Sequence, residues 1–352
     1  MSINIFRIPY FVVLVLALAL LLIGSGCTTT QQISSSGLDV PKAIPQSPEI
    51  DPDLEPLVSE PEISLDQELK ALASTGSWEE PLIPKEETQI CLDPEMAEPL
   101  YDFPVVVNRQ VQMYIDLFQG KQRKYFAKWL GRSGRYRDLI KSELEAAGLP
   151  KDLLYLAMIE SGFNQRAYSK SKAVGLWQFM SGTGRDYGLS VTRYVDERRD
   201  AEKSTKAAAA YLKDLYEEFG DWYLAVAAYN GGPGTMRKAI KKSKSRDFWK
   251  IAQNRSLRME TKRYVPKLIA AIMIAKQPEK YGFTDLAYAE PMTWETLEVG
   301  PGLSMAAVAI LTSSSEKDII LLNQELRTSK TPLNQERYRV KIPSGTKMLA
   351  QS

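Results

Sequence analysis

The chain has 352 residues, 44% of them hydrophobic, and no histidine. The missing histidine excludes Ser-His and Cys-His nucleophiles and disfavours a classical zinc site, so acid–base chemistry would fall to carboxylate, tyrosine or lysine side chains. The net charge of +2 conceals two opposed parts, because residues 28–99 carry 16 acidic and 3 basic side chains whereas residues 100–352 sum to +14. A basic part suits an anionic polymer such as nucleic acid or a cell-wall glycan, and it equally suits basic residues spread over solvated helices.

The first 27 residues have the pattern of an export signal. Arg7 precedes an uncharged run over residues 8–23, and three small residues then lead to Cys27. This end is similar to the lipobox of bacterial lipoproteins, in which the cysteine is lipidated; an uncleaved membrane anchor is the alternative. We therefore expect an exported chain at the periplasmic face, anchored through Cys27. The resemblance implies the outer membrane, because Thr28 rather than an aspartate follows the cysteine.

Residues 28–99 are predicted to be a disordered tether. They contain 10 of the 20 prolines, many acidic residues and few aromatic ones. Such a composition cannot bury enough apolar surface to offset the entropy of ordering. Cys91 has no metal-binding or redox spacing to Cys27, and we expect it to be a free thiol.

The part after residue 100 is predicted to be mainly α-helical. Apolar residues recur at intervals of three and four over 105–130, 135–147, 153–161, 204–219, 222–229 and 262–276. Asp221 is expected to cap one helix, and Pro266 to lie near the first turn of another. The first two helices would form a platform for the remainder.

The most unusual position in the helical part is Glu160. Leu153, Leu156 and Ala157 lie on one helical face, and Glu160 is the next position on that face. A carboxylate on a buried face is costly unless it is paired or protonated. Glu160 is therefore a candidate site residue, and a core ion pair with Arg or Lys is the alternative.

Four motifs occur in order: 160–164 (ESGFN), 175–180 (GLWQFM), 228–232 (AYNGG) and 260–267 (ETKRYVPK). Together they resemble the soluble-type (SLT, goose-lysozyme-like) lytic transglycosylase family over about residues 105–285. The last motif and the lipoprotein-like start are most similar to the membrane-bound lytic murein transglycosylase D group of that family. The resemblance implies a lysozyme-like domain that cleaves peptidoglycan.

The resemblance also assigns site residues. Glu160 matches the catalytic acid, and the substrate-binding positions are matched by Ser169, Trp177, Gln178, Met180, Tyr229, Asn230 and Tyr264. From the residues alone, Trp177 and Phe179 either stack on sugar rings or pack in the core. Tyr229 likewise either faces the site or packs at a helix end, and Tyr264 could orient Glu160.

A single acid fits one route of glycoside cleavage. Ordinary glycosidases use two carboxylates, whereas Asp186 and Asp196, the nearest in sequence, are expected to form a turn and cap a helix. Glu160 would protonate the bond between N-acetylmuramic acid and N-acetylglucosamine, and would then accept the proton of the 6-hydroxyl as a 1,6-anhydro ring closes. Burial against Leu156 should raise the pKa of Glu160, as it does for the general acid of lysozyme.

A β-α-α-β unit is predicted at the C-terminus. Strand patterns occur at 294–299 and 338–342, and helical patterns at 303–312 and 316–322. The unit is similar to a diverged LysM glycan-binding module, in which Gly300, Pro301 and Gly302 stand where LysM has Gly-Asp-Thr. A packing appendage without glycan binding is the equal alternative.

The predicted organisation is an export signal over 1–27, a linker over 28–99, a helical platform plus transglycosylase domain over 100–288 (core about 145–285) and a LysM-like module over 292–346. The predicted function is a lytic transglycosylase acting on peptidoglycan glycan strands. No cofactor, metal or nucleic acid is expected, and the membrane is expected as partner through the lipid anchor. The alternatives are a lysozyme-like hydrolase on the same fold and a non-catalytic wall-binding lipoprotein.

Overall fold

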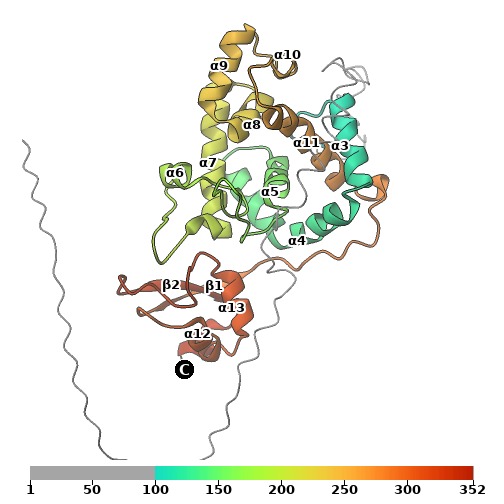
Figure 1. Ribbon diagram of the computed structural model, residues 1–352. Coiled ribbons are helices and arrows are strands. Elements are labelled where there is room, and N and C mark those ends of the chain that lie inside the picture. Colours follow the sequence, from blue (N-terminus) through green and yellow to red (C-terminus); the bar gives the residue numbers. More distant parts are fainter. Residues whose placement is uncertain (1–99, 352) are drawn as a thin grey trace, which may run out of the picture. The chain divides into compact units, whose positions relative to one another are not determined.

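The computed structural model describes residues 100–351 (Figure 1). The predicted export signal, Cys27, the acidic segment and Cys91 therefore lie outside the described residues. The helices up to residue 276 are α3 (Arg109–Gln119), α4 (Arg123–Ala146), α5 (Leu154–Ser161), α6 (Ser181–Asp186), α7 (Ala201–Phe219), α8 (Trp222–Gly231), α9 (Pro233–Ser243), α10 (Phe248–Gln253) and α11 (Met259–Lys276). The prediction of a mainly α-helical chain is confirmed.

The N-terminal platform differs from its prediction. The helix expected over 105–130 is two helices, because the Asn108 side chain caps α3 by accepting the Val111 N–H at 3.0 Å and the chain leaves helical geometry at Gly120. In contrast, α4 runs without a break through 131–134, where the prediction had a gap. Gly131 and Gly134 are needed in this helix because a later segment of the chain passes close to its backbone.

Residues 287–289 cross α4 at the two glycines. The Ala289 N–H donates to the Gly131 carbonyl at 2.8 Å, and a Cβ atom on Gly134 would lie 2.3 Å from the Ala289 carbonyl oxygen. A side chain at Gly134 is thus excluded by backbone, which cannot move as the end of a flexible side chain can. The two glycines fix the path by which the chain leaves the helical domain.

The helices around α5 begin and end at recognisable residues. Asp200 caps α7 by accepting the Lys203 N–H, so that helix starts three residues earlier than predicted, and it ends at Gly220 in the left-handed conformation. Asp221 caps α8 as predicted. Pro266 lies in the interior of α11 rather than near its first turn, because the helix already begins at Met259. Helix α5 packs against α4 and α11 and is buried along nearly its whole length.

The C-terminal part has the predicted β-α-α-β order. Its elements are β1 (Trp294–Val299), α12 (Met305–Leu311), α13 (Glu316–Leu322) and β2 (Tyr338–Pro343). The strands pair antiparallel, from Trp294 opposite Pro343 to Val299 opposite Tyr338. The core of this unit includes Val308, Ile319, Val340 and Ile342, all of them completely buried. Within residues 100–351, no helix is long and apolar enough to cross a membrane.

We predict that Gly134→Ala destabilises the protein by roughly 1–3 kcal/mol, because the methyl group would overlap the backbone of Ala289. An alanine inside a helix would otherwise stabilise it by roughly 0.5–1 kcal/mol relative to glycine. Gly182→Ala in α6 is the matched control, since no atom lies within 4 Å of its added Cβ. Thermal unfolding of both variants checks the prediction, and an unchanged or higher Tm for Gly134→Ala would contradict it.

Candidate active site

Glu160 occupies the last turn of α5, at the centre of the helical domain. The six residues before it and Ser161 after it are buried, so α5 is apolar around its whole circumference rather than on one face. The helix ends at Gly162, whose φ of +58° is left-handed and where a Cβ would lie 2.3 Å from the Trp129 indole nitrogen. Only glycine fits this turn, which aims the end of α5 and the following loop.

The environment of the Glu160 carboxyl favours its protonated form. The residue is partly exposed, as a group that reaches a substrate must be, yet burial of the carboxyl raises its pKa to about 7. A hydrogen bond from the Tyr264 hydroxyl and the charge of Lys267 act in the opposite direction, and the charge of Glu260 adds to the rise. Tyr264 is itself 6% exposed and projects from α11. At neutral pH a large fraction of Glu160 can donate a proton.

Glu260 is a carboxylate at this site whose role the sequence did not reveal, although it opens the fourth motif. It is exposed, and its Oε1 accepts a hydrogen bond of 3.4 Å from the Asn230 amide. The amide oxygen of Asn230 accepts from the Thr261 hydroxyl at 2.9 Å. The third and fourth motifs are thereby joined, and Asn230 is oriented from both ends of its amide.

The loop over 164–180 forms a wall beside α5. The Ser161 hydroxyl ties the helix to it by donating to the Ala157 carbonyl at 3.0 Å and the Leu176 carbonyl at 2.9 Å. Ser169 and Gln178 are both partly exposed, and Met180 is 47% exposed. These three predicted site residues therefore offer a hydroxyl, an amide and an apolar side chain at the surface.

The structure favours the core alternative for Trp177 and Phe179. Trp177 is completely buried and its indole N–H donates to the Thr205 hydroxyl at 2.9 Å, so its ring is not available to a sugar. Phe179 is 3% exposed and packs edge-on against Tyr229. The Tyr229 hydroxyl donates to the Trp177 carbonyl at 2.8 Å. Tyr229 thus holds the backbone of the wall at Trp177. Burial and the charge of the Glu160 carboxylate raise the pKa of Tyr229 well above its usual range.

Asp196 occupies the N-cap position of the short 3₁₀ helix Glu197–Arg199, but its side chain is used differently from the expected helix cap. Asp196 is 1% exposed, makes no capping bond, and accepts two hydrogen bonds of 2.8 Å from the Arg198 guanidinium. Burial acts to raise the pKa of Asp196, but the bonds and charge of Arg198 hold it below the usual range. Asp186 is the last residue of α6. Among residues 100–351, no group of three or more His, Cys, Asp or Glu side chains could hold a metal ion.

A half-buried glutamate in the last turn of a buried helix, beside a polar loop, is the arrangement that the resemblance to a lysozyme-like domain leads us to expect. Residues 138–252 match the transglycosylase SLT domain family. The membrane-bound lytic murein transglycosylase D of Escherichia coli (strain K12) is 34% identical over 242 residues, which are 67% of this chain and 51% of that protein. The chain therefore carries a transglycosylase SLT domain, and the resemblance predicted from the four motifs is confirmed.

Two further similarities cover smaller parts of the chain. The membrane-bound lytic murein transglycosylase C of Edwardsiella ictaluri (strain 93-146) is 28% identical over 162 residues, 39% of this chain and 45% of that protein. The solved structure of the 70 kDa soluble lytic transglycosylase SLT70 from Escherichia coli is 26% identical, with a TM-score of 0.36, and covers 44% of this chain and 26% of its own. The chain spans about half the length of the curated relatives it matches.

The charges around Glu160 predict two opposite shifts of a pH profile. Activity that needs protonated Glu160 falls as the pH rises through its pKa of about 7. Lys267→Met removes a cation that lowers this pKa, so the alkaline limb should move to higher pH, whereas Glu260→Gln removes an anion that raises it, so the limb should move to lower pH. The measurement is kcat/KM against pH for both variants. Shifts in the same direction, or none, would contradict the assignment of Glu160 as the titrating acid.

Proposed function

We propose that the chain is a lytic transglycosylase that cleaves the β-1,4 bond between N-acetylmuramic acid and N-acetylglucosamine in peptidoglycan. The observation that carries the proposal is the Glu160 carboxyl, whose pKa burial raises to about 7 and which Tyr264 orients by a hydrogen bond. A group with this pKa can give and take a proton at the same pH, as a reaction with one acid–base residue requires. The SLT domain and the names of its relatives support this assignment.

The reaction needs two proton transfers at one carboxyl. Glu160 donates its proton to the glycosidic oxygen, the bond to C1 of the muramic residue breaks, and the substrate's own acetamide stabilises the positive charge. Ionised Glu160 then takes the proton of the muramic 6-hydroxyl, whose oxygen forms a bond to C1. The product ends in a 1,6-anhydro ring, and no water is consumed. Tyr264 would donate its hydrogen bond to Glu160 throughout the cycle and so hold the oxygen in place.

The wall and the third motif supply groups that suit an amino sugar. Ser169 and Gln178 offer a hydroxyl and an amide, and Asn230 offers its amide from the opposite motif. Met180 would shape the wall without taking part in the chemistry. Trp177 would act on the glycan only indirectly. Its ring packs in the core, where it bonds Thr205, and so supports the backbone of the wall.

A hydrolase on the same fold is the second candidate, and Glu260 is the observation that favours it. An inverting hydrolase needs a second carboxylate that activates water. Glu260 is near enough to raise the pKa of Glu160, and it contacts Asn230. The two candidates differ in their products, because an anhydro end is lighter than a reducing end by one water molecule.

Mass spectrometry of the products from purified sacculi distinguishes the two candidates. We expect anhydro ends from the wild-type chain and from Glu260→Gln, and a loss of at least roughly 10²–10⁴-fold in rate for Glu160→Gln, which cannot donate the proton. Glu160→Gln should still bind glycan. Reducing ends alone, together with an inactive Glu260→Gln, would establish the hydrolase instead. Full digestion by Glu160→Gln would remove Glu160 from the mechanism, whereas glycan binding without any turnover by the wild-type chain would leave a non-catalytic wall-binding protein as the candidate.

We also propose that the chain is exported and anchored at the periplasmic face of the outer membrane through a lipid on Cys27. The motif before Cys27 and the membrane-bound names of the relatives support this. Cys27→Ser should then release the protein into the soluble periplasmic fraction, because the residue that carries the proposed lipid anchor would be missing. Membrane retention equal to wild type after cell fractionation would instead indicate an uncleaved anchor.

A further inference from the structure

The C-terminal unit contacts the segment between α6 and α7 through its backbone. The Asp196 N–H donates to the Glu325 carbonyl at 2.8 Å, and the Arg327 N–H donates to the Tyr194 carbonyl at 2.9 Å. Val195, between them, is 4% exposed and belongs to the hydrophobic core of the C-terminal unit. The segment is thus bonded to this unit by an isolated antiparallel β-bridge between Val195 and Leu326.

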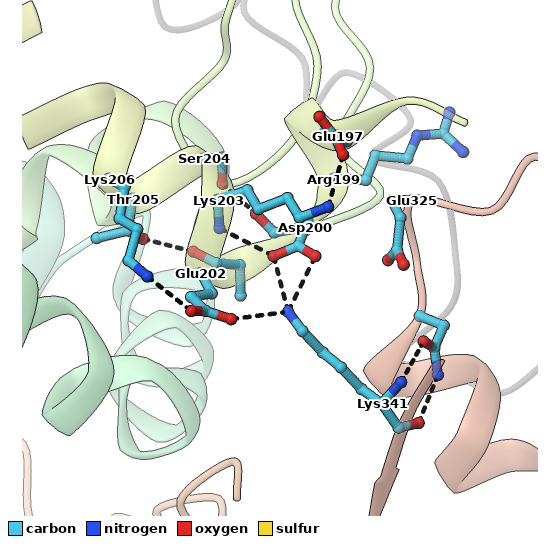
Figure 2. Close-up of polar contacts among 12 residues, drawn as sticks. Glu197, Arg199, Asp200, Glu202, Lys203, Ser204, Thr205, Lys206, Glu325 and Lys341 are labelled. Atoms are coloured by element: carbon cyan, nitrogen blue, oxygen red, sulfur yellow. Dashed lines mark hydrogen bonds and ion pairs between the residues drawn. The ribbon is translucent and has the colours of Figure 1, made fainter. Parts of the chain in front are cut away.

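A buried ion pair strengthens the same contact (Figure 2). The Lys341 ammonium on β2 lies 2.8 and 2.9 Å from the two carboxylate oxygens of Asp200 and 3.5 Å from Glu202. Lys341 and Asp200 are 8% and 2% exposed. Removing one partner of such a pair leaves a buried charge uncompensated. Glu325 lies close by, accepts from the Tyr338 hydroxyl at 3.0 Å, and has its pKa raised to about 7 by burial and by the charge of Asp200.

Arg198 joins this contact to the wall of the candidate active site. One side of its guanidinium donates two bonds of 2.8 Å to Asp196, and the same carboxylate accepts a 3.0 Å bond from Arg327 of the C-terminal unit. The remaining nitrogen of Arg198 donates to the Phe179 carbonyl at 3.0 Å and to the Lys172 carbonyl at 3.1 Å. Three direct contacts therefore lead from the C-terminal unit to the backbone beside Met180.

The backbone of Arg198 is also in contact with the wall. A Cβ atom on Gly175, whose φ is +86°, would lie 1.8 Å from the Arg198 carbonyl oxygen. Val174 and Phe179 exchange backbone hydrogen bonds of 3.1 Å, which close residues 174–179 into a tight loop. Arg198 thus meets this loop at two points: its carbonyl packs closely against Gly175, and its guanidinium donates a hydrogen bond to the Phe179 carbonyl.

We propose that Arg198 is a positioning residue, which holds residues 172–180 of the wall for the glycan and is itself fixed by the C-terminal unit through Asp196 and Arg327. The inference rests on the proposed function, because it gives a role in glycan binding to a contact outside the chemistry. A lysine could not replace this arginine, since it lacks the planar fork that bonds Asp196 by two nitrogens while a third reaches the carbonyls. The C-terminal unit therefore stabilises the position of the wall through Arg198, whether or not this unit itself binds glycan.

The test compares full-length variants on soluble peptidoglycan glycan chains. Arg327→Gln removes the side-chain bond of the C-terminal unit to the Asp196 carboxylate and leaves every bond of Arg198 in place, whereas Arg198→Lys removes the fork. Arg337→Gln is the matched control, because Arg337 pairs with Glu298 on the exposed surface of the same unit, where its side chain is 82% exposed. We expect KM to rise by a few-fold for Arg327→Gln and by roughly tenfold or more for Arg198→Lys, because small displacements of positioning groups are costly.

Three further readouts separate positioning from a general structural role. The kcat and the alkaline limb of the pH profile should stay at their wild-type values, since the surroundings of Glu160 are unchanged. The double variant Arg198→Lys/Arg327→Gln should have the KM of Arg198→Lys alone, because the C-terminal unit acts through Arg198. Arg337→Gln should match wild type in every measurement.

Several results would overturn the inference. They are an unchanged KM for Arg198→Lys, an unchanged KM for Arg327→Gln, additive effects in the double variant, or a loss confined to kcat that parallels a fall in Tm. Failure of the proposed function would be recognised separately. A wild-type chain that yields only reducing ends would reject the transglycosylase, while the KM comparison would still decide the role of Arg198.

Discussion

The hydrogen bond between the Tyr264 hydroxyl and the Glu160 carboxyl joins the first half of α11 to the last turn of α5, and the rest of the site is built around it. A carboxyl that keeps its proton near neutral pH must be enclosed, yet it must also reach a substrate. The enclosure comes from α5, which is buried around its circumference, and the access comes from the sharp turn at Gly162. The charge of Lys267 then lowers the pKa of Glu160, and the charge of Glu260 raises it. The chemistry proposed for Glu160 depends on this balance of burial, one hydrogen bond and two charges.

Features set by local sequence could be predicted. The end of α5 at Gly162, the Asp221 cap and the β-α-α-β order each depend on residues only a few positions apart. Glu160 could be identified because an acid on an apolar helix is unfavourable and needs a reason. The four motifs then resembled one family, and the SLT domain confirms that resemblance. The predicted roles of Ser169, Gln178, Met180 and Asn230 in binding a glycan stay predictions.

Features set by contacts between distant residues could not be predicted. The apolar periodicity left residues 131–134 outside the predicted helices, and only the passage of Ala289 shows why α4 runs through them with glycines at 131 and 134. The sequence was equally compatible with a Trp177 ring that faces a sugar. The structure instead shows the ring in the core, where its N–H bonds the Thr205 hydroxyl. Asp196 follows a turn pattern, but its partner Arg327 lies 131 residues further along the chain. The periodicity of a sequence segment does not predict such contacts, because they depend on how two segments that fold separately pack against each other.

The Asp200 carboxylate has a consequence for how the molecule unfolds. It completes the first turn of α7 by accepting the Lys203 N–H, and it also pairs with Lys341, 141 positions away. Detaching the C-terminal unit would therefore break a buried ion pair at the start of a helix that packs against α4 and α8. We therefore expect the two parts to unfold in one cooperative transition, instead of melting one after the other as loosely tethered modules do. During synthesis, α7 gains its last partner only when the final strand has left the ribosome.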